Sequence, residues 1–273
     1  MSRSGYYAWS RRPPSKRSVT DERLTDTIRQ IHVDSRSTYG APRVHAELAD
    51  DHDICVGRKR VARLMRIAGI VGVSRGRKWR TTVPDPAAPP APDLVCRDFT
   101  ATSPNQLWIA DFTYVPTGQG FLFLSIVIDV FSRMVVGWSM RDDMRAELVI
   151  DALSMAVDRR RPGEGLVHHS DRGSQYTSVA FGRELAASDI SASMGSRGDA
   201  YDNAAAESFM ATIKTELMSG VRFPTRHAAR LAIFDYIESF YNRRRRHSAL
   251  GNKSPLVFEQ IHATLMSAQA EAA

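Results

Sequence analysis

The stretch LWIADFTYVPTGQGFLFLSIVIDVFSRMVVGWSM, residues 107–140, decides the fold class. It contains three short runs rich in β-branched and aromatic residues, at 107–115, 121–130 and 134–140, separated only by PTGQG and FSR. Strand-like runs joined by connections this short are typical of antiparallel neighbours. The stretch therefore predicts an antiparallel meander of three strands.

The residues after the meander alternate between helical and strand-like patterns. An apolar face at helical spacing predicts a helix over 142–161, which Pro162 ends, and a strand-like run follows at 165–171. Further helices are predicted over 177–190 and around 225–246. Three antiparallel strands followed by alternating helices and strands is the order of a ribonuclease H-like α/β sandwich.

Composition divides the chain into segments around this core. Five prolines between residues 84 and 92 exclude both a helix and a central strand, so a linker is predicted over 81–103. We expect the ribonuclease H-like core over 104–222. A C-terminal helix and a basic tail are expected over 223–273.

The residues before the linker predict a small all-α domain over 21–80, behind a basic segment at 1–20. Helical runs occupy 21–32, 41–50 and 56–70, and the last one carries an apolar stripe among several cations. Three short helices with a basic last helix are typical of helix-turn-helix domains, whose last helix contacts DNA. A small bundle with merely solvated arginines is the alternative. The candidate DNA contacts are Arg58, Lys59, Arg60, Arg63 and Arg66.

The distribution of charge supports an acidic partner for the amino-terminal part. The net charge is +7, with 37 Lys and Arg against 30 Asp and Glu. Residues 1–80 hold 18 of these cations and 8 of the acids, a balance of +10, which leaves −3 for the rest. Basic modules of this kind most often bind nucleic acid. A basic surface that only aids solubility is the alternative.

Cysteine content and hydropathy indicate where the protein works. Cys55 and Cys96 are far apart and have no ligand-like neighbours, which argues against a zinc site or a disulfide framework and fits a reducing cytosol. The longest apolar run, at 121–130, is too short to span a bilayer, and the amino terminus lacks a signal-peptide core. We expect a cytoplasmic protein with no membrane partner.

Acidic residues on separate elements are the candidate catalytic groups. Asp111 shares its strand face with apolar residues, where a carboxylate is costly to bury unless it is paired or binds a metal. Asp171 ends the predicted strand at 165–171, the end of a strand at which α/β folds place ligand groups. Each Asp alone has a plain structural alternative, as a solvent-facing strand residue or as the start of a loop.

The stretch SRGDAYDNAAAESFMATIKTEL, residues 196–217, holds four more acids. Asp199 and Asp202 suit a helix start, where short acids accept free backbone amides. Glu207 lies at the margin of the apolar face of this helix, from which it can point toward the sheet. Glu216 lies away from that margin, so we predict that it is on the surface.

Three carboxylates that converge from separate elements would suit hard divalent cations. Mg²⁺ or Mn²⁺ prefers oxygen ligands, and a pair of such ions serves phosphodiester transfer. Asp111, Asp171 and Glu207 are therefore the candidate metal ligands, for two ions. Lys214 lies on the same helix face as Glu207 and is a candidate phosphate contact, with a salt bridge or a solvated lysine as the alternative.

The motifs WIADFTY, HHSDRGSQY and GDAYDNAAAESF, with 35 residues between Asp171 and Glu207, resemble the catalytic core of second-frame (OrfB-type) insertion-sequence transposases. These enzymes belong to the D,D,E superfamily, which includes retroviral integrases. TYGAPRVHAEL and VGRKRVARLMRIAGI resemble their amino-terminal helical region, and YNRRRRHSALGNKSPLVFE resembles their carboxyl-terminal signature. The resemblance covers nearly the whole chain.

The resemblance implies Mg²⁺-dependent cleavage of DNA strands at element ends and strand transfer to target DNA, with the three acids as metal ligands. It implies that Lys214 and Asn203 hold the terminal DNA, and that His169 and Arg172 contact substrate or support the loop. In the 243–246 arginine run, Arg244 and Arg245 are candidate phosphate contacts, with a solvated helix end as the alternative.

The family also implies partners for this chain. Related proteins carry further upstream sequence, and a first-frame protein supplies a helix-turn-helix and a leucine zipper through a frameshift fusion. We therefore expect a catalytic half that acts with such a partner and forms a homo-oligomer on DNA. The competing functions are a non-catalytic DNA-binding remnant of a transposase and a ribonuclease H-type nuclease.

Overall fold

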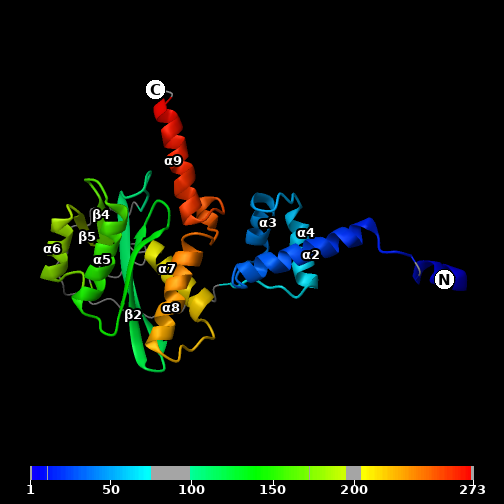
Figure 1. Cartoon of the computed structure of the whole chain (residues 1–273), viewed down its shortest axis with the longest axis horizontal. Helices are drawn as coiled ribbons and strands as arrows, with labels where there is room; N and C mark the ends of the chain where they lie inside the picture. Colours follow the sequence, from blue (N-terminus) through cyan, green and yellow to red (C-terminus); the bar gives the residue numbers. More distant parts are fainter. Residues whose placement is uncertain (1, 11, 75–98, 172, 195–203, 272–273) are drawn as a thin grey trace, which may run out of the picture. The chain divides into compact units, whose positions relative to one another are not determined.

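A computed structural model of the chain describes residues 2–10, 12–74, 99–171, 173–194 and 204–271. The chain forms two compact units, Met1–Ser74 and Arg75–Ala273 (Figure 1). Each unit has its own apolar core. The two are described separately below.

The first unit is entirely helical. Its described helices are α1 (Arg3–Ser10), α2 (Lys16–Asp34), α3 (Ala41–Asp50) and α4 (Arg58–Ile67). The last three confirm the predicted helices, although α2 begins before residue 21, where the Ser15 side chain accepts a hydrogen bond from the Ser18 amide. Helix α1 was not predicted. One apolar face of each of α2, α3 and α4 is buried, which contributes Leu24, Ile28, Ile31, Val44, Leu48, Val61, Leu64 and Met65 to the core.

The second unit is built on a mixed sheet of five strands. Its strand order is β3-β2-β1-β4-β5, with β1 (Leu107–Thr117), β2 (Gly120–Asp129), β3 (Val135–Arg141), β4 (Val167–Ser170) and β5 (Ser191–Met194). The first three strands are antiparallel neighbours, which confirms the predicted meander. Strands β4 and β5 continue the sheet in parallel with β1.

Helices cover both faces of this sheet (Figure 1). On one face lie α5 (Ala146–Arg160) and α6 (Val179–Ala187), and on the other lie α7 (Ala204–Ile213) and α8 (Arg226–Asp235). The meander, the parallel strands and the two helical layers together form the ribonuclease H-like α/β core that the sequence predicts. The helix and strand expected after the meander are present as α5 and β4.

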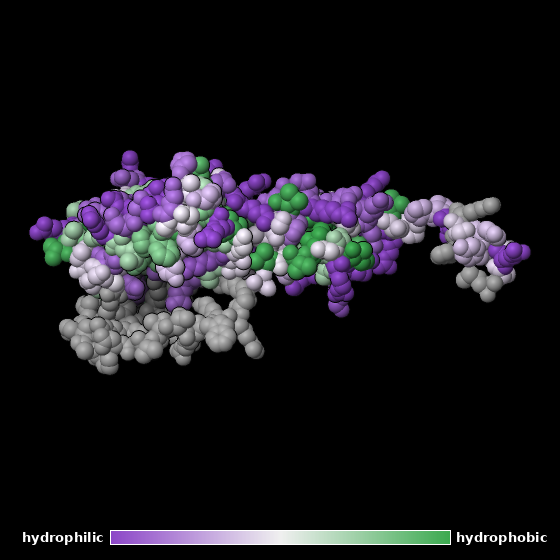
Figure 2. Space-filling model, turned by 90° about the horizontal axis from the view of Figure 1, so that it is seen from below, coloured by the Kyte–Doolittle hydropathy of each residue, from purple (hydrophilic) through white to green (hydrophobic). Residues whose placement is uncertain are grey.

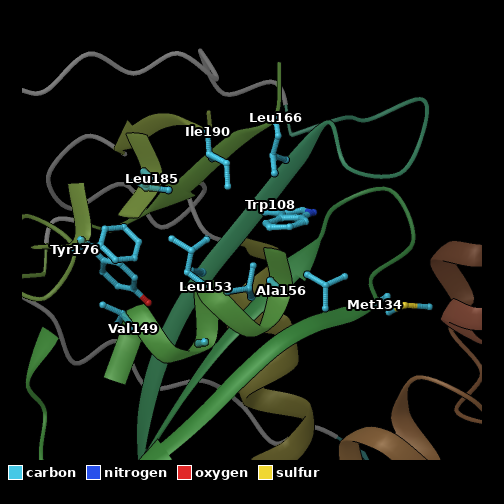
Figure 3. Packing of buried hydrophobic residues seen from close by; sticks show 14 residues of the cluster. Trp108, Met134, Val149, Leu153, Ala156, Leu166, Tyr176, Leu185 and Ile190 are labelled. Atoms are coloured by element: carbon cyan, nitrogen blue, oxygen red, sulfur yellow. The ribbon is translucent and has the colours of Figure 1, made fainter. Parts of the chain in front are cut away.

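A large apolar cluster between α5, α6 and the sheet holds the core together (Figure 3). Leu153 and Ala156 of α5 and Trp108 of β1 are fully buried within it. Helix α5 lies so close to β3 that a side chain at Gly137 would overlap the carbonyl oxygen of Ala152. Only glycine therefore permits this packing.

The C-terminal region differs from the single helix predicted around 225–246. Helix α8 ends at Asp235 and continues as a π-helical segment, η2 (Tyr236–Tyr241), so the arginine run at 243–246 follows the helix. A further helix that was not predicted, α9 (Pro255–Glu271), starts with a proline at its first position, where the missing N–H is tolerated. Figure 1 shows α9 extending away from the sheet. The η3 turn (Ser248–Leu250) connects these segments.

On the face shown in Figure 2, apolar side chains appear as separate patches among hydrophilic ones. Among the described residues, no helix combines the length and the apolar character that crossing a bilayer requires.

Candidate active site

Two of the predicted acids are brought side by side by the register of the sheet. Strand β4 pairs in parallel with β1 from Leu107↔Val167 to Ile109↔His169. The same register, continued for two more residues, aligns Asp171 with Asp111. Asp171 lies just after the end of β4, and Asp111 lies in the middle of the longer β1. The carboxyl end of a short parallel strand thus opens beside a central strand, the position at which α/β sheets bind ligands.

Backbone amides orient both aspartates. The Phe112 amide donates to Asp111 Oδ1 at 2.8 Å. The Gly173 amide donates to Asp171 Oδ1 at 3.0 Å, within a tight turn directly after β4. Asp111 is half-buried and Asp171 is exposed. Each carboxylate accepts one hydrogen bond from a backbone amide and therefore keeps acceptor capacity for a ligand.

Glu207 approaches these aspartates from the α7 layer. Its neighbours Ala206, Met210 and Ile213 are buried against the sheet, while Glu207 itself is half-buried at the margin of that face. The pKa of Asp111 is raised to about 7, chiefly by burial and also by the negative charges of Asp171 and Glu207, against the opposing Phe112 amide and Lys214. The three carboxylates therefore share one electrostatic neighbourhood.

This neighbourhood fits a divalent cation in its chemistry but is not a closed ligand set. The donors are all carboxylate oxygens, which hard cations prefer. Yet within the described ranges no three His, Cys, Asp or Glu side chains lie close enough together to coordinate one ion. Like charges repel, so a cation would be needed to draw these carboxylates together.

Lys214 is a cation whose charge acts on the pKa of Asp111. It is exposed at the start of the π-helical segment η1 (Lys214–Met218), which continues α7. Its Nζ lies 5.7 Å from the ring centroid of Tyr114 on β1, and its charge opposes the rise in the pKa of Asp111. Lys214 thus lies at the border of the acidic neighbourhood.

Comparisons with known proteins agree with this architecture. An integrase core domain matches residues 101–200, and a second integrase core model matches 188–255. An HTH-like domain matches residues 20–78. The insertion element IS600 31 kDa protein of Shigella sonnei is 45% identical over 261 residues, covering 95% of this chain and 95% of that protein. The chain belongs to the insertion-sequence transposases of the D,D,E integrase superfamily.

Further comparisons are consistent with this membership. The transposase for IS904 of Lactococcus lactis is 39% identical over 92% of this chain and 99% of its own length. Among solved structures, the HTLV-2 integrase catalytic core domain in complex with magnesium is similar with a TM-score of 0.42 and 20% identity, covering 56% of this chain and 95% of that one. Family membership therefore rests on the sequence relatives and not on this structural similarity. The family makes the transposase a polynucleotidyl transferase.

The histidines before Asp171 support the strand in this transposase. His168 and His169 are both buried, and burial, helped by His169, lowers the pKa of His168 to about 4. The Nδ1 of His169 lies 3.0 Å from Ser193 Oγ on β5, and its ring packs edge-on against Phe99. His169 therefore connects β4 to β5 and packs against Phe99, and both roles expected for it, contact with substrate and support of the loop, stay predictions.

The prediction that Glu216 is on the surface is wrong. Its side chain is only 7% exposed and forms a buried ion pair with Arg245, whose side chain is 5% exposed. Arg245 donates from Nη2 to Oε1 at 2.7 Å and from Nε to Oε2 at 2.8 Å, and the Tyr236 hydroxyl donates to Oε2 at 2.8 Å. The surface prediction followed the position of Glu216 within its own helix. Only the fold brings η2 and the arginine run against it.

The same ion pair engages Arg245, one of the candidate phosphate contacts. A guanidinium that is buried and bound bidentately to a carboxylate presents no donors to DNA in this structure. Arg246 is buried as well and donates to the Asn252 carbonyl at 2.9 Å, whereas Arg244 is exposed. Two of the four arginines are therefore buried in contacts within the protein and two are exposed. Neither the predicted phosphate contact nor the alternative of a solvated helix end included this division.

The other predicted DNA contacts are distributed unevenly. On α4, Arg58, Lys59 and Arg66 are exposed. Arg60 and Arg63 both reach Asp21 of α2, at 2.6 Å each, and these bonds, led by that of Arg63, lower the pKa of Asp21. Asn203 and Arg172, together with the predicted helix-start acids Asp199 and Asp202, lie outside the described residues.

Proposed function

We propose that this transposase cleaves DNA strands at the ends of its insertion sequence and joins them to target DNA, with Asp111, Asp171 and Glu207 as its catalytic carboxylates. The observation that carries the proposal is the action of the charges of Asp171 and Glu207 on the Asp111 carboxyl group, together with a β1–β4 register that leads from Ile109↔His169 toward these two aspartates. A solvated surface acid would not have its pKa raised by burial and by two neighbouring acids together.

The carboxylates are proposed to hold divalent cations, either Mg²⁺ or Mn²⁺ and two in number. Oxygen-only donors and an excess of negative charge at a half-buried site support this assignment. When bound, such ions activate the attacking oxygen and stabilise the leaving oxygen of a phosphodiester. Hydrogen bonds from the backbone amides of Phe112 and Gly173 hold the two aspartates in fixed orientations before any cation binds.

Cations around the acids are proposed to position the DNA. Lys214 is exposed next to the acidic neighbourhood and would contact a phosphate near the scissile bond. Arg244 would contact a phosphate from the arginine run. In the helical unit, the exposed Arg58, Lys59 and Arg66 would bind phosphates, and Arg60 and Arg63 would do so in competition with Asp21. Asn203 and Arg172 stay proposed contacts on the family resemblance alone.

We also propose that the enzyme acts as an oligomer on DNA, together with a first-frame protein or fused to one. The support is the family resemblance of the whole chain, including its helix-turn-helix-like unit. Such a partner would add DNA recognition to a chain that carries the catalytic core. Work in the cytoplasm follows from the same proposal, because chromosomal DNA is the substrate of a bacterial insertion sequence.

The proposal is tested by Mg²⁺-dependent cleavage and joining of labelled DNA taken from the flanks of the gene. Glu207→Gln removes one ligand charge at nearly constant shape, so we expect cleavage to fall by at least about 100-fold, as for the loss of a metal-site group. Glu147→Gln makes the same chemical change at an exposed position in the first turn of α5 and should have no effect.

Four outcomes would decide between parts of the proposal and its alternatives. Cleavage by Glu207→Gln at near the wild-type rate would exclude Glu207 from catalysis. Cleavage by the fused form alone would show that this chain is a catalytic half, and inactivity of both forms would favour a DNA-binding remnant. Cleavage of RNA–DNA hybrids without strand joining would instead indicate a ribonuclease H-type nuclease.

A further inference from the structure

Three aromatic side chains lie together at the turn end of the β1–β2 hairpin. Tyr114 and Phe121 are 59% and 53% exposed, and their ring centroids are 5.3 Å apart at an interplanar angle of 69°. Phe123 is half-buried with its centroid 6.5 Å from that of Phe121. We call Tyr114, Phe121 and Phe123 the aromatic platform. Large aromatic rings left in solvent as a group are typical of a binding surface.

The sheet keeps this platform uncovered on one side. Tyr114 and Phe123 are cross-strand partners, which holds the platform on paired β-structure. On the other edge of β1, the described strands pair only from Leu107 to Ile109, because β4 is short. Between Ile109 and the isolated bridge of Thr117 with Phe223, no described strand pairs with this edge of β1, and Tyr114 lies in that part.

Lys214 links the platform to the acids. Its Nζ lies 5.7 Å from the Tyr114 ring centroid, within the range of a cation–π contact. The same side chain acts electrostatically on Asp111. Lys214 is thus within reach of the Tyr114 ring and acts on the charge of Asp111, although alternation along β1 puts these two side chains on opposite faces of the strand.

Further cations border the platform on the far side from Asp111. Arg226 donates from Nε to the Phe121 carbonyl oxygen at 3.1 Å. Arg226 and Arg230 both pair with Asp142, at 3.2 and 2.8 Å, so two guanidinium groups share one carboxylate there. Exposed rings flanked by cations on both sides match the pattern that binds unpaired nucleic-acid strands.

We propose that the aromatic platform stacks an unpaired base of the DNA strand whose end lies among the catalytic carboxylates. This inference rests on the proposed function. A paired base has both faces covered by its neighbours in the duplex, whereas an unpaired terminal base offers a face to Tyr114 or Phe121. Lys214 and Arg226 would then face the phosphates on either side of it. DNA supplies a phosphate charge at every nucleotide for these cations, whereas a second copy of this chain, with a net charge of +7, would not supply an excess of negative charge.

The test measures binding by the full chain carrying Glu207→Gln, which leaves the DNA uncut. The probes are a paired duplex from the gene flank and the same duplex with mismatched end bases that include 2-aminopurine. We expect tighter binding of the mismatched end and quenching of its fluorescence on stacking. Tyr114→Ala and Phe121→Ala should each weaken that binding by about tenfold and leave the paired duplex unaffected. Tyr114→Trp should retain it.

Phe234→Ala is the matched control, because Phe234 is an aromatic residue of the same unit that is 49% exposed and packs on Trp138 instead. Equal binding of both DNA ends by wild type and alanine variants would overturn the inference. So would a change in oligomeric mass without DNA in Tyr114→Ala, because it would identify a protein interface. Cleavage by the wild type is measured separately, and its absence alone would overturn the proposed function. An end preference that the alanine substitutions leave unchanged would overturn base stacking alone.

Discussion

Glu207 and Glu216 lie on one continuous helical segment, α7 followed by η1, yet they meet opposite surroundings. Glu207 adds its charge to those of Asp111 and Asp171, so that part of the protein concentrates negative charge. Glu216 is neutralised by Arg245, which binds it through two hydrogen bonds, with a third from Tyr236. The charge of Glu207 thus raises the pKa of Asp111, whereas the charge of Glu216 is neutralised by Arg245 of the protein itself.

The contacts at the Glu216 end accompany raised pKa values of the two groups that donate to Glu216, Arg245 and Tyr236. Burial disfavours the charged guanidinium, but the Glu216 bonds more than offset this and raise the pKa of Arg245 above its ordinary value. Burial also raises the pKa of Tyr236, and the charge of Glu216 adds to the effect. We infer that this end anchors the helix that presents Glu207 and Lys214.

The largest expected effect on stability separates the two glutamates. Glu216→Gln leaves the buried Arg245 without its counter-charge, so the free energy of unfolding should fall by about 3–5 kcal/mol. Glu207→Gln removes a charge from among like charges and should leave that free energy unchanged or slightly higher. Urea unfolding of the two variants without divalent ions measures both. Equal losses in the two variants would break the comparison.

A double substitution asks whether charge or shape matters at the anchoring end. Replacing both partners, Glu216→Met with Arg245→Met, removes the buried ion pair without leaving either charge uncompensated. The double variant should recover to within about 1–2 kcal/mol of the wild type, because apolar side chains of similar size often substitute for buried ion pairs. The thermal midpoint provides the measurement. Losses that simply add would show that the two side chains act independently.

Lys214 marks the boundary between the two ends and should show the smallest effect. Lys214→Ala should leave the unfolding free energy unchanged, because the side chain is exposed. We expect DNA binding to weaken and the slope of log affinity against log salt to fall by about 1, as for the loss of one phosphate contact. A salt titration of binding to flank DNA tests this. An unchanged slope would assign Lys214 to the structural end instead.

Local pattern was sufficient for much of the fold. The runs at 107–140 predicted the meander, since strand pairing follows from alternation and short turns. The apolar stripe of Val61, Leu64 and Met65 predicted the buried face of α4. The helix predicted through 246 ends at Tyr241 instead, and the side-chain amide of the next residue, Asn242, bonds the backbone N–H and carbonyl of Val135 at 2.9 Å each.

The candidate site was likewise predictable from the sequence in part: its acids were, and the contacts around them were not. The spacing of Asp111, Asp171 and Glu207 in their motifs pointed to one family and one chemistry before any contact was known. The environment of Glu216 and Arg245 was invisible, because these residues are 29 positions apart and no periodicity relates them. The aromatic platform was likewise hidden, since Tyr114 and Phe121 read as ordinary strand residues.

The sequence by itself determined four of the five described strands, most of the described helices, the family and the candidate acids, because periodicity and motif spacing are properties of neighbouring residues. Only the tertiary structure decided which charges are neutralised and which lie among like charges. Whether a charge is stable depends on its burial and on its nearest partners. In this transposase those partners come from distant parts of the chain: β4 brings Asp171 to Asp111, and the arginine run brings Arg245 to Glu216.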